Sequence, residues 1–296
     1  MAFATPRPAP TPSDIAGDAA SVPALLSRQA FDRVRAFFQQ ASGIALGDNK
    51  YSLVANRLMR LASEVGSPHL DAYVAHVLGP AATPEEQARL VDRLTINETY
   101  FFRESAHFDH LAALARQRRE RSPGREFLVW SAAASSGEEA FTAAIVLQEA
   151  LGAAPWRVIG TDLSGEMVDV ARAGLYPLER GRHVAPALLQ RHCLKGVGRY
   201  AGQFLVSREL RSRVTFLQGN LLGVLPELPR FDVIFLRNVL IYFDADPKRQ
   251  IVMRVLQQLA DGGLLYTGHA ENLSGLDLPL QLVQTAIYTP RPATRP

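Results

Sequence analysis

The stretch FDVIFLRNVLIYF, residues 231–243, decides the fold of this chain. Its first half is a short apolar run rich in β-branched and aromatic residues, which is typical of a buried strand in a parallel sheet. Arg237 and Asn238 follow at the point where such a strand would end. Because open α/β sheets bind ligands at the carboxyl ends of their strands, we expect Arg237, Asn238 and Tyr242 to lie at a functional site.

Strand-like and helix-like segments alternate on both sides of this stretch. Apolar runs predict strands at 127–130, 157–160, 214–217 and 264–267, and amphipathic segments predict helices at 138–150, 164–173 and 246–260. Gly262 and Gly263 are expected to stop the last helix. The alternating residues 280–289 predict a closing antiparallel pair at the edge of the sheet. This order predicts a doubly wound α/β sheet with helices on both faces.

The alternation breaks within residues 182–213. Glycines are frequent over 196–202, and they surround Tyr200, Phe204 and Val206. Short apolar segments interrupted by glycine are typical of turns between short strands. This region therefore predicts a small antiparallel insertion.

Composition excludes several classes of protein. Hydrophobic residues make up 47% and charged residues 21% of the 296 positions, as in an ordinary globular protein, and the net charge of +3 is too weak to indicate nucleic-acid binding. Cys193 is the only cysteine, which fits a reducing compartment and favours a buried thiol over a nucleophile. No apolar run has the length of a membrane span, and the N-terminus lacks the apolar core of a signal peptide. We expect a cytoplasmic protein without membrane insertion.

The N-terminal third predicts a tail followed by helices. Residues 1–23 are rich in Ala, Pro, Thr and Ser and are expected to be disordered. From there to residue 92 the pattern is helical, with an apolar stripe at Val54, Leu58, Leu61 and Val65. Three basic residues flank this stripe: Lys50, Arg57 and Arg60. A solvated helix flank explains them most simply, and a basic face for an acidic partner is the alternative.

The loop after the first predicted strand, 131–139, is a run of small residues that leads into a helix. It lacks the lysine of a P-loop and the spacing of GxGxxG. Glu138 and Glu139 stabilise the helix dipole, and they also suit a ligand with a cationic amine. Successive helical residues point about 100° apart, so only one of the two is expected to face a ligand.

Two polar residues follow other predicted strands. Asp162 lies 162 − 137 = 25 residues after Gly137, and a carboxylate at a spacing of about 20 accepts hydrogen bonds from a ribose diol in nucleotide-binding α/β folds. Asp162 can also cap the next helix, although Ser164 is better placed for that role. Asn220 is a weaker candidate for the adenine side of such a ligand, since alone it is typical of a turn.

A polar group also precedes the first predicted strand. Asn97, Thr99 and Arg103 lie close together within 94–104, and Arg103 can bind a carboxylate through two hydrogen bonds. A capped amphipathic segment with Phe101 and Phe102 in the core is the alternative. His269 follows the last parallel strand, but no motif has metal-ligand spacing and no serine lies in a G-x-S-x-G elbow, so neither a metal site nor a hydrolase is expected.

Six segments in series resemble chemotaxis protein methyltransferases, the CheR family. They are LTINETYFFRE (94–104), WSAAASSGEE (130–139), GTD (160–162), ARAGLY (171–176), residues 231–243 and GHAEN (268–272). The resemblance covers residues 28–290 in the right order. Ala270 stands where the family more often has Ser, Ser136 where Thr is common, and Ala140 where Pro is common, and none of these departures removes a charge.

The resemblance implies a Rossmann-like class I methyltransferase domain at 93–296. It further implies an N-terminal all-helical domain at 24–92 that docks a receptor, and a β-subdomain at about 194–216. The cofactor would be S-adenosyl-L-methionine, and the product S-adenosyl-L-homocysteine. The implied reaction is methyl esterification of glutamate side chains on the cytoplasmic helices of chemoreceptors by a monomeric enzyme. The alternatives are a methyltransferase of the same fold acting on another protein or a small molecule, or a regulator that binds the cofactor without turnover.

The resemblance also assigns residues by position. Arg103 and Tyr242 are the residues implied in the transfer, with Tyr242 beside the methyl group. Glu139 matches the family's cofactor contact better than Glu138. The full set of implied cofactor contacts is Asn97, Thr99, Arg103, Glu139, Asp162, Asn220, Leu221, Arg237 and Asn238. Since an acidic helical bundle would be the substrate, Lys50, Arg57 and Arg60 are expected to dock it.

Overall fold

The computed structural model describes residues 26–291, and this part of the chain forms two compact units. The smaller unit takes residues 26–36 and 47–93, and the larger one takes 37–46 and 94–291. The tail expected at 1–23 lies outside the described residues. The helix α1 (Arg28–Ser42) contributes its first part to the smaller unit and its end to the larger one.

The smaller unit is helical, as predicted. Its other helices are α2 (Tyr51–Glu64), α3 (Leu70–Val77) and α4 (Pro84–Leu94), with a 3-10 turn η1 (Asp48–Lys50) before α2. Val54, Leu58 and Leu61 are buried, which confirms the predicted stripe up to that point. Val65 is 50% exposed because α2 ends at Glu64, so its assignment to the stripe was wrong.

The larger unit is built on a seven-stranded sheet with the order β6-β2-β1-β7-β8-β10-β9. The first five strands in this order run parallel, and β10 pairs antiparallel with β8 and β9. The bounds are β1 (Phe127–Ala132), β2 (Trp156–Asp162), β6 (Val214–Gln218), β7 (Phe231–Leu236), β8 (Leu259–Thr267), β9 (Leu280–Gln284) and β10 (Ile287–Pro290). The predicted α/β sheet and its antiparallel edge are therefore confirmed.

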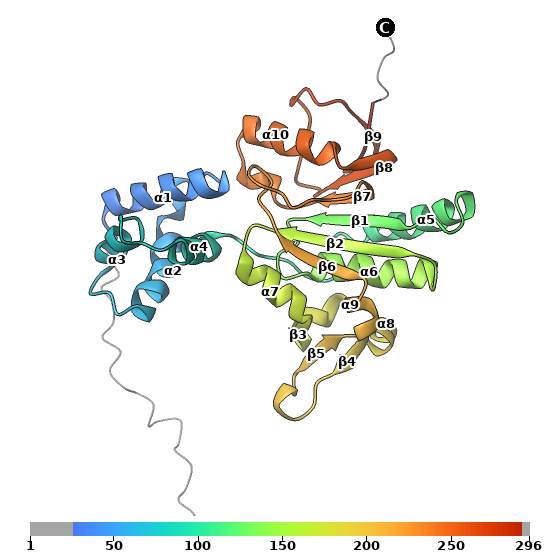
Figure 1. Ribbon diagram of the computed structural model, residues 1–296, viewed down its shortest axis with the longest axis horizontal. Coiled ribbons are helices and arrows are strands. Elements are labelled where there is room, and N and C mark those ends of the chain that lie inside the picture. Colours follow the sequence, from blue (N-terminus) through green and yellow to red (C-terminus); the bar gives the residue numbers. More distant parts are fainter. Residues whose placement is uncertain (1–25, 292–296) are drawn as a thin grey trace, which may run out of the picture. The chain divides into compact units, whose positions relative to one another are not determined.

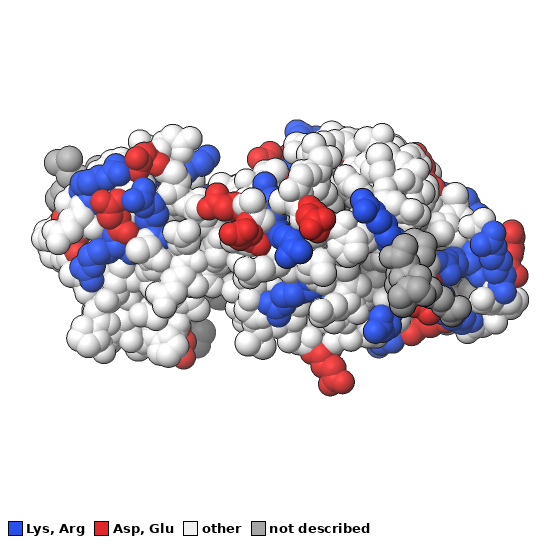
Figure 2. Space-filling view, turned by 90° about the horizontal axis from the view of Figure 1, so that it is seen from above, with Lys and Arg blue, Asp and Glu red and all other residues white. Residues whose placement is uncertain are grey.

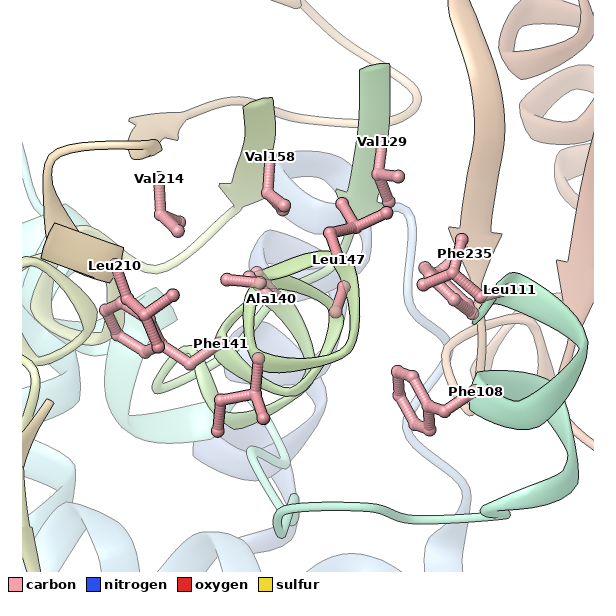
Figure 3. Close-up of a cluster of buried hydrophobic side chains, with 14 of the residues drawn as sticks. Phe108, Leu111, Val129, Ala140, Phe141, Leu147, Val158, Leu210, Val214 and Phe235 are labelled. Atoms are coloured by element: carbon pink, nitrogen blue, oxygen red, sulfur yellow. The ribbon is translucent and has the colours of Figure 1, made fainter. Parts of the chain in front are cut away.

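Helices cover both faces of this sheet (Figure 1). They are α5 (Ala106–Arg121), α6 (Glu138–Leu151), α7 (Gly165–Ala173) and α10 (Ala245–Leu256). Side chains of α5 and α6, including Phe108 and Phe141, pack beneath Val129, Val158 and Phe235 (Figure 3). The apolar residues of α10 pack in a second core with the opposite face of the sheet.

The strand β7 lies between β1 and β8, and all six of its residues are buried. Val233 and Phe235 belong to the core under α5 and α6, whereas Ile234 and Leu236 belong to the core under α10. Burial on both faces explains why the strand is a continuous apolar run rather than an alternating one. The expectation for the first half of residues 231–243 is confirmed.

One boundary differs from the prediction. The helix α10 ends at Leu256, and β8 already begins at Leu259, so the predicted extension of this helix to Ala260 was wrong. Gly262 and Gly263 lie inside β8, near a register shift against β7. A Cβ on Gly263 would lie 2.9 Å from the carbonyl oxygens of Ala260 and Phe231, so glycine here serves a close backbone approach, not a helix stop.

A second, three-stranded antiparallel sheet confirms the predicted insertion. Its order is β3-β5-β4, with β3 (Leu175–Pro177), β4 (Cys193–Lys195) and β5 (Gln203–Val206). Figure 1 shows it beside the short helices α8 (Pro186–His192) and α9 (Arg208–Arg211). The sheet begins with β3, earlier in the chain than the expected 194–216. This strand was not predicted because three residues are too few to give an alternating pattern. Val214, at the end of that expected range, starts β6 of the large sheet.

Within the described residues, no helix has the length and apolar character needed to cross a membrane.

Candidate functional site

The carboxyl ends of the parallel strands bring the predicted polar residues to one edge of the large sheet. In the register of the sheet, Ser131 lies opposite both Gly160 and Phe235, so β1, β2 and β7 end at a similar level. Asp162 is the last residue of β2, Ser135 and Arg237 lie in the loops after β1 and β7, and the segment after β8 carries residues 268–272. This is the edge at which open α/β sheets bind ligands.

Arg237 is the charged centre of this edge. It is 5% exposed, and its guanidinium donates hydrogen bonds to Glu139 at 2.9 Å, to Glu104 at 3.0 Å and to the Arg103 carbonyl oxygen. The guanidinium also lies over the ring of Phe108, 5.5 Å from its centroid. Arg237 therefore joins two segments that are far from it in the sequence, one at residues 103–108 and the other at Glu139.

The two acids of this cluster differ in their electrostatics. Burial raises the pKa of Glu139, although Arg237 and the Ser131 hydroxyl, which donates to Glu139 at 2.7 Å, both favour its charged form. Burial also opposes the ionisation of Glu104, but there Arg237 prevails and holds the pKa below its usual value. One guanidinium facing two carboxylates leaves one net negative charge when both are ionised.

Glu138 points to different partners from Glu139. It accepts hydrogen bonds from the Ser136 hydroxyl at 2.6 Å and from Arg180 at 3.2 Å, its side chain is only 1% exposed, and burial raises its pKa. Arg180 comes from the 3-10 segment η2 (Leu178–His183) and also donates to the Thr99 carbonyl oxygen at 2.7 Å. Glu139 therefore joins the Arg237 cluster, whereas Glu138 ties the region of the small sheet to the site.

Asp162 holds the loop after β1 in place. Its two carboxylate oxygens accept from the backbone N–H groups of Ser135, at 2.7 Å, and Ser164, at 2.9 Å. Ser164 in turn caps α7 through its own side chain, as the sequence indicated. Ala133 and Ser135 have positive φ angles of 77° and 50°, so the loop is sharply bent here. The carboxylate of Asp162 therefore lies at the end of β2, against the backbone of the loop after β1.

The segment before α5 also reaches this edge. The Asn97 carbonyl oxygen accepts from the Ser135 hydroxyl at 3.1 Å, which joins the segment to the loop after β1. The Asn97 amide donates to the Thr95 hydroxyl at 3.1 Å. Phe101 is buried in the core, as the alternative interpretation expected, while Phe102 is half-buried. The structural interpretation thus holds for Phe101, and the ligand contacts expected of Asn97, Thr99 and Arg103 stay a prediction.

Arg103 is half-buried, and its guanidinium donates to the Glu98 carbonyl oxygen at 3.0 Å and lies over the Tyr100 ring. Within the described part of the chain, Arg103 forms no ion pair with a carboxylate. Tyr242 ends a 3-10 turn, η4 (Leu240–Tyr242), shortly after β7, and it is also half-buried. Asn238 adopts a left-handed conformation with φ 58° between Arg237 and this turn.

Asn220 and Leu221 differ from the other predicted contacts. The Asn220 amide donates to the Ala41 carbonyl oxygen at 3.0 Å, and its oxygen accepts from the Leu222 backbone N–H at 2.9 Å. Leu221 is 9% exposed and packs in the core under α10. In this structure Asn220 acts as a turn residue, which was the alternative weighed for it.

Sequence reasoning missed one cluster of ionisable residues. Glu104, His107 and His269 have side-chain ligand atoms within 4.8 Å of one another, although no spacing motif indicated this. His107 is 2% exposed, and burial, with Arg237 nearby, lowers its pKa to about 4. Arg237 already provides the positive charge that balances Glu104, and a second cation beside it would be repelled. The arrangement therefore favours the guanidinium over a metal ion.

The three basic residues of the smaller unit are not equivalent. Lys50 is half-buried in η1, Arg60 is exposed on α2, and Arg57 donates to the Arg93 carbonyl oxygen at 2.9 Å. Arg57 therefore has a role inside its own unit. The face of the molecule in Figure 2 carries basic and acidic side chains interspersed rather than one large area of a single sign.

The chain matches two protein-family descriptions in succession. Residues 29–95 match "CheR methyltransferase, all-alpha domain", and residues 97–289 match "CheR methyltransferase, SAM binding domain". A chemotaxis protein methyltransferase of Salmonella typhimurium is 39% identical over 266 residues, which are 89% of this chain and 90% of the relative. Chemotaxis protein methyltransferase 2 of Pseudomonas aeruginosa is 38% identical over 270 residues, 89% of this chain and 94% of that protein. The chain belongs to the CheR methyltransferase family, and its larger unit contains the family's S-adenosylmethionine-binding domain.

Proposed function

We propose that this protein transfers the methyl group of S-adenosylmethionine to glutamate side chains on the cytoplasmic helices of a chemoreceptor. The products are a glutamate methyl ester and S-adenosylhomocysteine. The relatives are chemotaxis protein methyltransferases by name, which supports a chemotaxis substrate. The observation that carries the proposal is the charge cluster of Arg237, Glu139 and Glu104 at the carboxyl edge of the sheet, with Asp162 at the same edge.

The residues at this edge fit the charges of the methyl donor. S-adenosylmethionine has an ammonium, a carboxylate, a sulfonium and a ribose diol. The net negative charge on the Arg237 cluster suits the ammonium, with Glu139 as its direct partner. We assign the diol to Asp162, because a carboxylate accepts hydrogen bonds and this one lies at the end of β2. Arg103, with no carboxylate partner in the described chain, can bind the carboxylate.

The reaction needs little acid–base chemistry from the protein. The donor supplies a methyl group on a positively charged sulfur, and one C–O bond forms as one C–S bond breaks. A glutamate acceptor has a reference pKa of about 4.3, so it is already ionised at neutral pH and no general base is required. The protein's part is to hold the carboxylate oxygen in line and to exclude water, and we assign Tyr242 to this part.

Labelled methyl transfer tests the proposal. With a receptor cytoplasmic fragment and methyl-labelled donor, we expect label on the receptor that alkali releases as methanol, as for an ester. Arg103→Ala should weaken donor binding and transfer, and Tyr242→Phe should lower the transfer rate with donor binding retained. Wild-type behaviour in both variants would remove these residues from the mechanism. Label on another protein or a small molecule would favour a different substrate, and donor binding without transfer would favour a regulator.

A further inference from the structure

Glu271 makes an unusual set of contacts. It is 6% exposed, and its carboxylate accepts hydrogen bonds from three backbone N–H groups: those of Asn238 at 2.7 Å, Leu240 at 2.6 Å and Gly268 at 2.7 Å. One oxygen accepts from Asn238 and Gly268, and the other accepts from Leu240. One side chain thus joins the loop after β7 to the loop after β8.

Two of these three donors, Asn238 and Leu240, belong to the backbone that presents the proposed site residues. Asn238 follows Arg237 directly and has a left-handed φ of 58°, a conformation that asparagine adopts more readily than most other non-glycine residues. Leu240 is the first residue of η4, the turn that ends at Tyr242. The carboxylate therefore binds two backbone N–H groups of the segment from Arg237 to Tyr242.

The backbone at Gly268 lies close to the same residues. A Cβ on Gly268 would lie 2.7 Å from the side-chain amide nitrogen of Asn238, 2.8 Å from the Glu271 carboxylate and 3.1 Å from the Asn238 backbone nitrogen. The loops after β7 and β8 are therefore in direct contact around the carboxylate. We therefore expect a change in Glu271 to alter the position of Asn238, whose backbone N–H it binds.

We propose that Glu271 is a positioning residue for methyl transfer, which holds Asn238 and Tyr242 in place through the backbone of 238–240. This inference rests on the proposed function of the carboxyl edge. Three N–H donors require an acceptor on both oxygens. A glutamine offers one acceptor oxygen and a donor NH₂ group, so it would leave at least one N–H facing another donor.

Asp232 provides a matched control. It lies near the amino end of β7, whereas Glu271 binds the loop at the carboxyl end of β7. Asp232 is 1% exposed and also accepts from a backbone N–H, that of Leu128 at 3.0 Å, and from Arg125 at 2.7 Å. Asp232→Asn and Glu271→Gln make the same exchange of carboxylate for amide at buried positions. Only Glu271 lies at the carboxyl edge. The two variants therefore separate a loss of stability from a loss of positioning.

We expect Glu271→Gln to lower kcat for methyl transfer by about 10- to 100-fold, as small displacements at a reacting centre do. Its KM for the receptor should stay near the wild-type value, since the residues assigned to receptor docking are elsewhere. Asp232→Asn should lower the midpoint of thermal unfolding while retaining kcat. Glu271→Asp keeps both acceptor oxygens at a shorter reach and should give an intermediate kcat.

Three results would overturn the inference. Wild-type kcat in Glu271→Gln or in Glu271→Asp would show that the contacts do not position the site. If kcat falls in both Glu271→Gln and Asp232→Asn, and in each variant in proportion to its loss of stability, the role of Glu271 is structural alone. A wild-type protein that does not bind S-adenosylmethionine in calorimetry would instead overturn the proposed function first. If the wild-type protein binds S-adenosylmethionine and transfers its methyl group, and Glu271→Gln does so at the same rate, only the inference on Glu271 is overturned.

Discussion

At the scale of single residues, the site depends on how one buried arginine is compensated. Arg237 is paired with Glu139 and Glu104, which lie 98 and 133 positions away in the sequence. Sequence reasoning proposed Arg237 and Asp162 because each follows a predicted strand, and Glu139 because it lies in the first turn of the next helix and matches the family's contact. It missed Glu104 and Glu271 as partners because a contact across loops leaves no mark in a local pattern.

The raised pKa of Glu139 makes donor binding depend on pH. As the pH falls through a pKa above the usual glutamate range, Glu139 takes up a proton and loses the charge that would bind the ammonium. Affinity for S-adenosylmethionine should therefore fall between neutral and mildly acidic pH, with proton release on binding at the lower pH. Calorimetry in two buffers of different ionisation enthalpy measures both quantities.

Glu139→Gln is the corresponding variant. It should bind the donor about tenfold or more weakly at neutral pH and lose most of the pH dependence. A wild-type pH profile in this variant would mean that another group titrates, and Glu139 would not be the partner of the ammonium.

At the scale of elements, the strands and most helices follow from the hydrophobic period, whereas three features do not. The boundary between α10 and β8 lies at residues 257–258 and not at the glycine pair 262–263. The pattern did not show this, because a glycine pair can stop a helix or lie at a close approach between strands. The strand β3 has three residues, too few to give a period. The link from η2 to the site through Arg180 also left no pattern, since it joins positions 42 and 81 residues apart.

Removing Arg180 should leave Glu138 as a buried acid without its charged partner. We expect Arg180→Met to lower the free energy of unfolding by about 1–3 kcal/mol, the range for a lost hydrogen bond between charged groups. It should also weaken donor binding, because the Thr99 carbonyl oxygen loses its donor. Chemical unfolding and calorimetry measure the two effects.

A double-mutant cycle with Glu138→Gln isolates the pair. Arg180→Met combined with Glu138→Gln should recover part of the lost stability, since the remaining buried group is then neutral. Strictly additive losses would show that Arg180 and Glu138 do not interact energetically in the protein.

At the scale of the whole molecule, the order of a helical unit followed by an α/β unit was evident from the sequence, and the two family matches follow the same order. Residues 37–46 belong to the larger unit, since the Ala41 carbonyl oxygen accepts from Asn220 and Gly43 packs against Leu222. Nothing in a continuous helical pattern marks the residue at which a helix leaves one compact unit for another.

We propose that the smaller unit docks an acidic receptor through Lys50 and Arg60. Combined Lys50→Glu and Arg60→Glu should raise KM for the receptor by about tenfold at low salt with kcat unchanged, because charge complementarity acts mainly on encounter. The difference should shrink at high salt. Arg57 is left intact because it binds the Arg93 carbonyl oxygen inside its own unit.

Combined reversal of Arg33 and Arg116, two exposed arginines of α1 and α5, changes the net charge equally and serves as the control. The two double variants are compared by steady-state methylation at low and high salt. Equal effects of both would attribute the change to net charge, and the docking assignment would be wrong.

Titration of S-adenosylmethionine by calorimetry into the wild-type protein and into Asp162→Ala tests the central claim most directly. The claim is that the carboxyl edge of the sheet holds the methyl donor. We predict one donor bound per wild-type chain and an affinity at least about tenfold lower in Asp162→Ala, which loses both the proposed diol contact and the tie to Ser135. No binding by the wild type, or equal affinity in the two proteins, would contradict the claim.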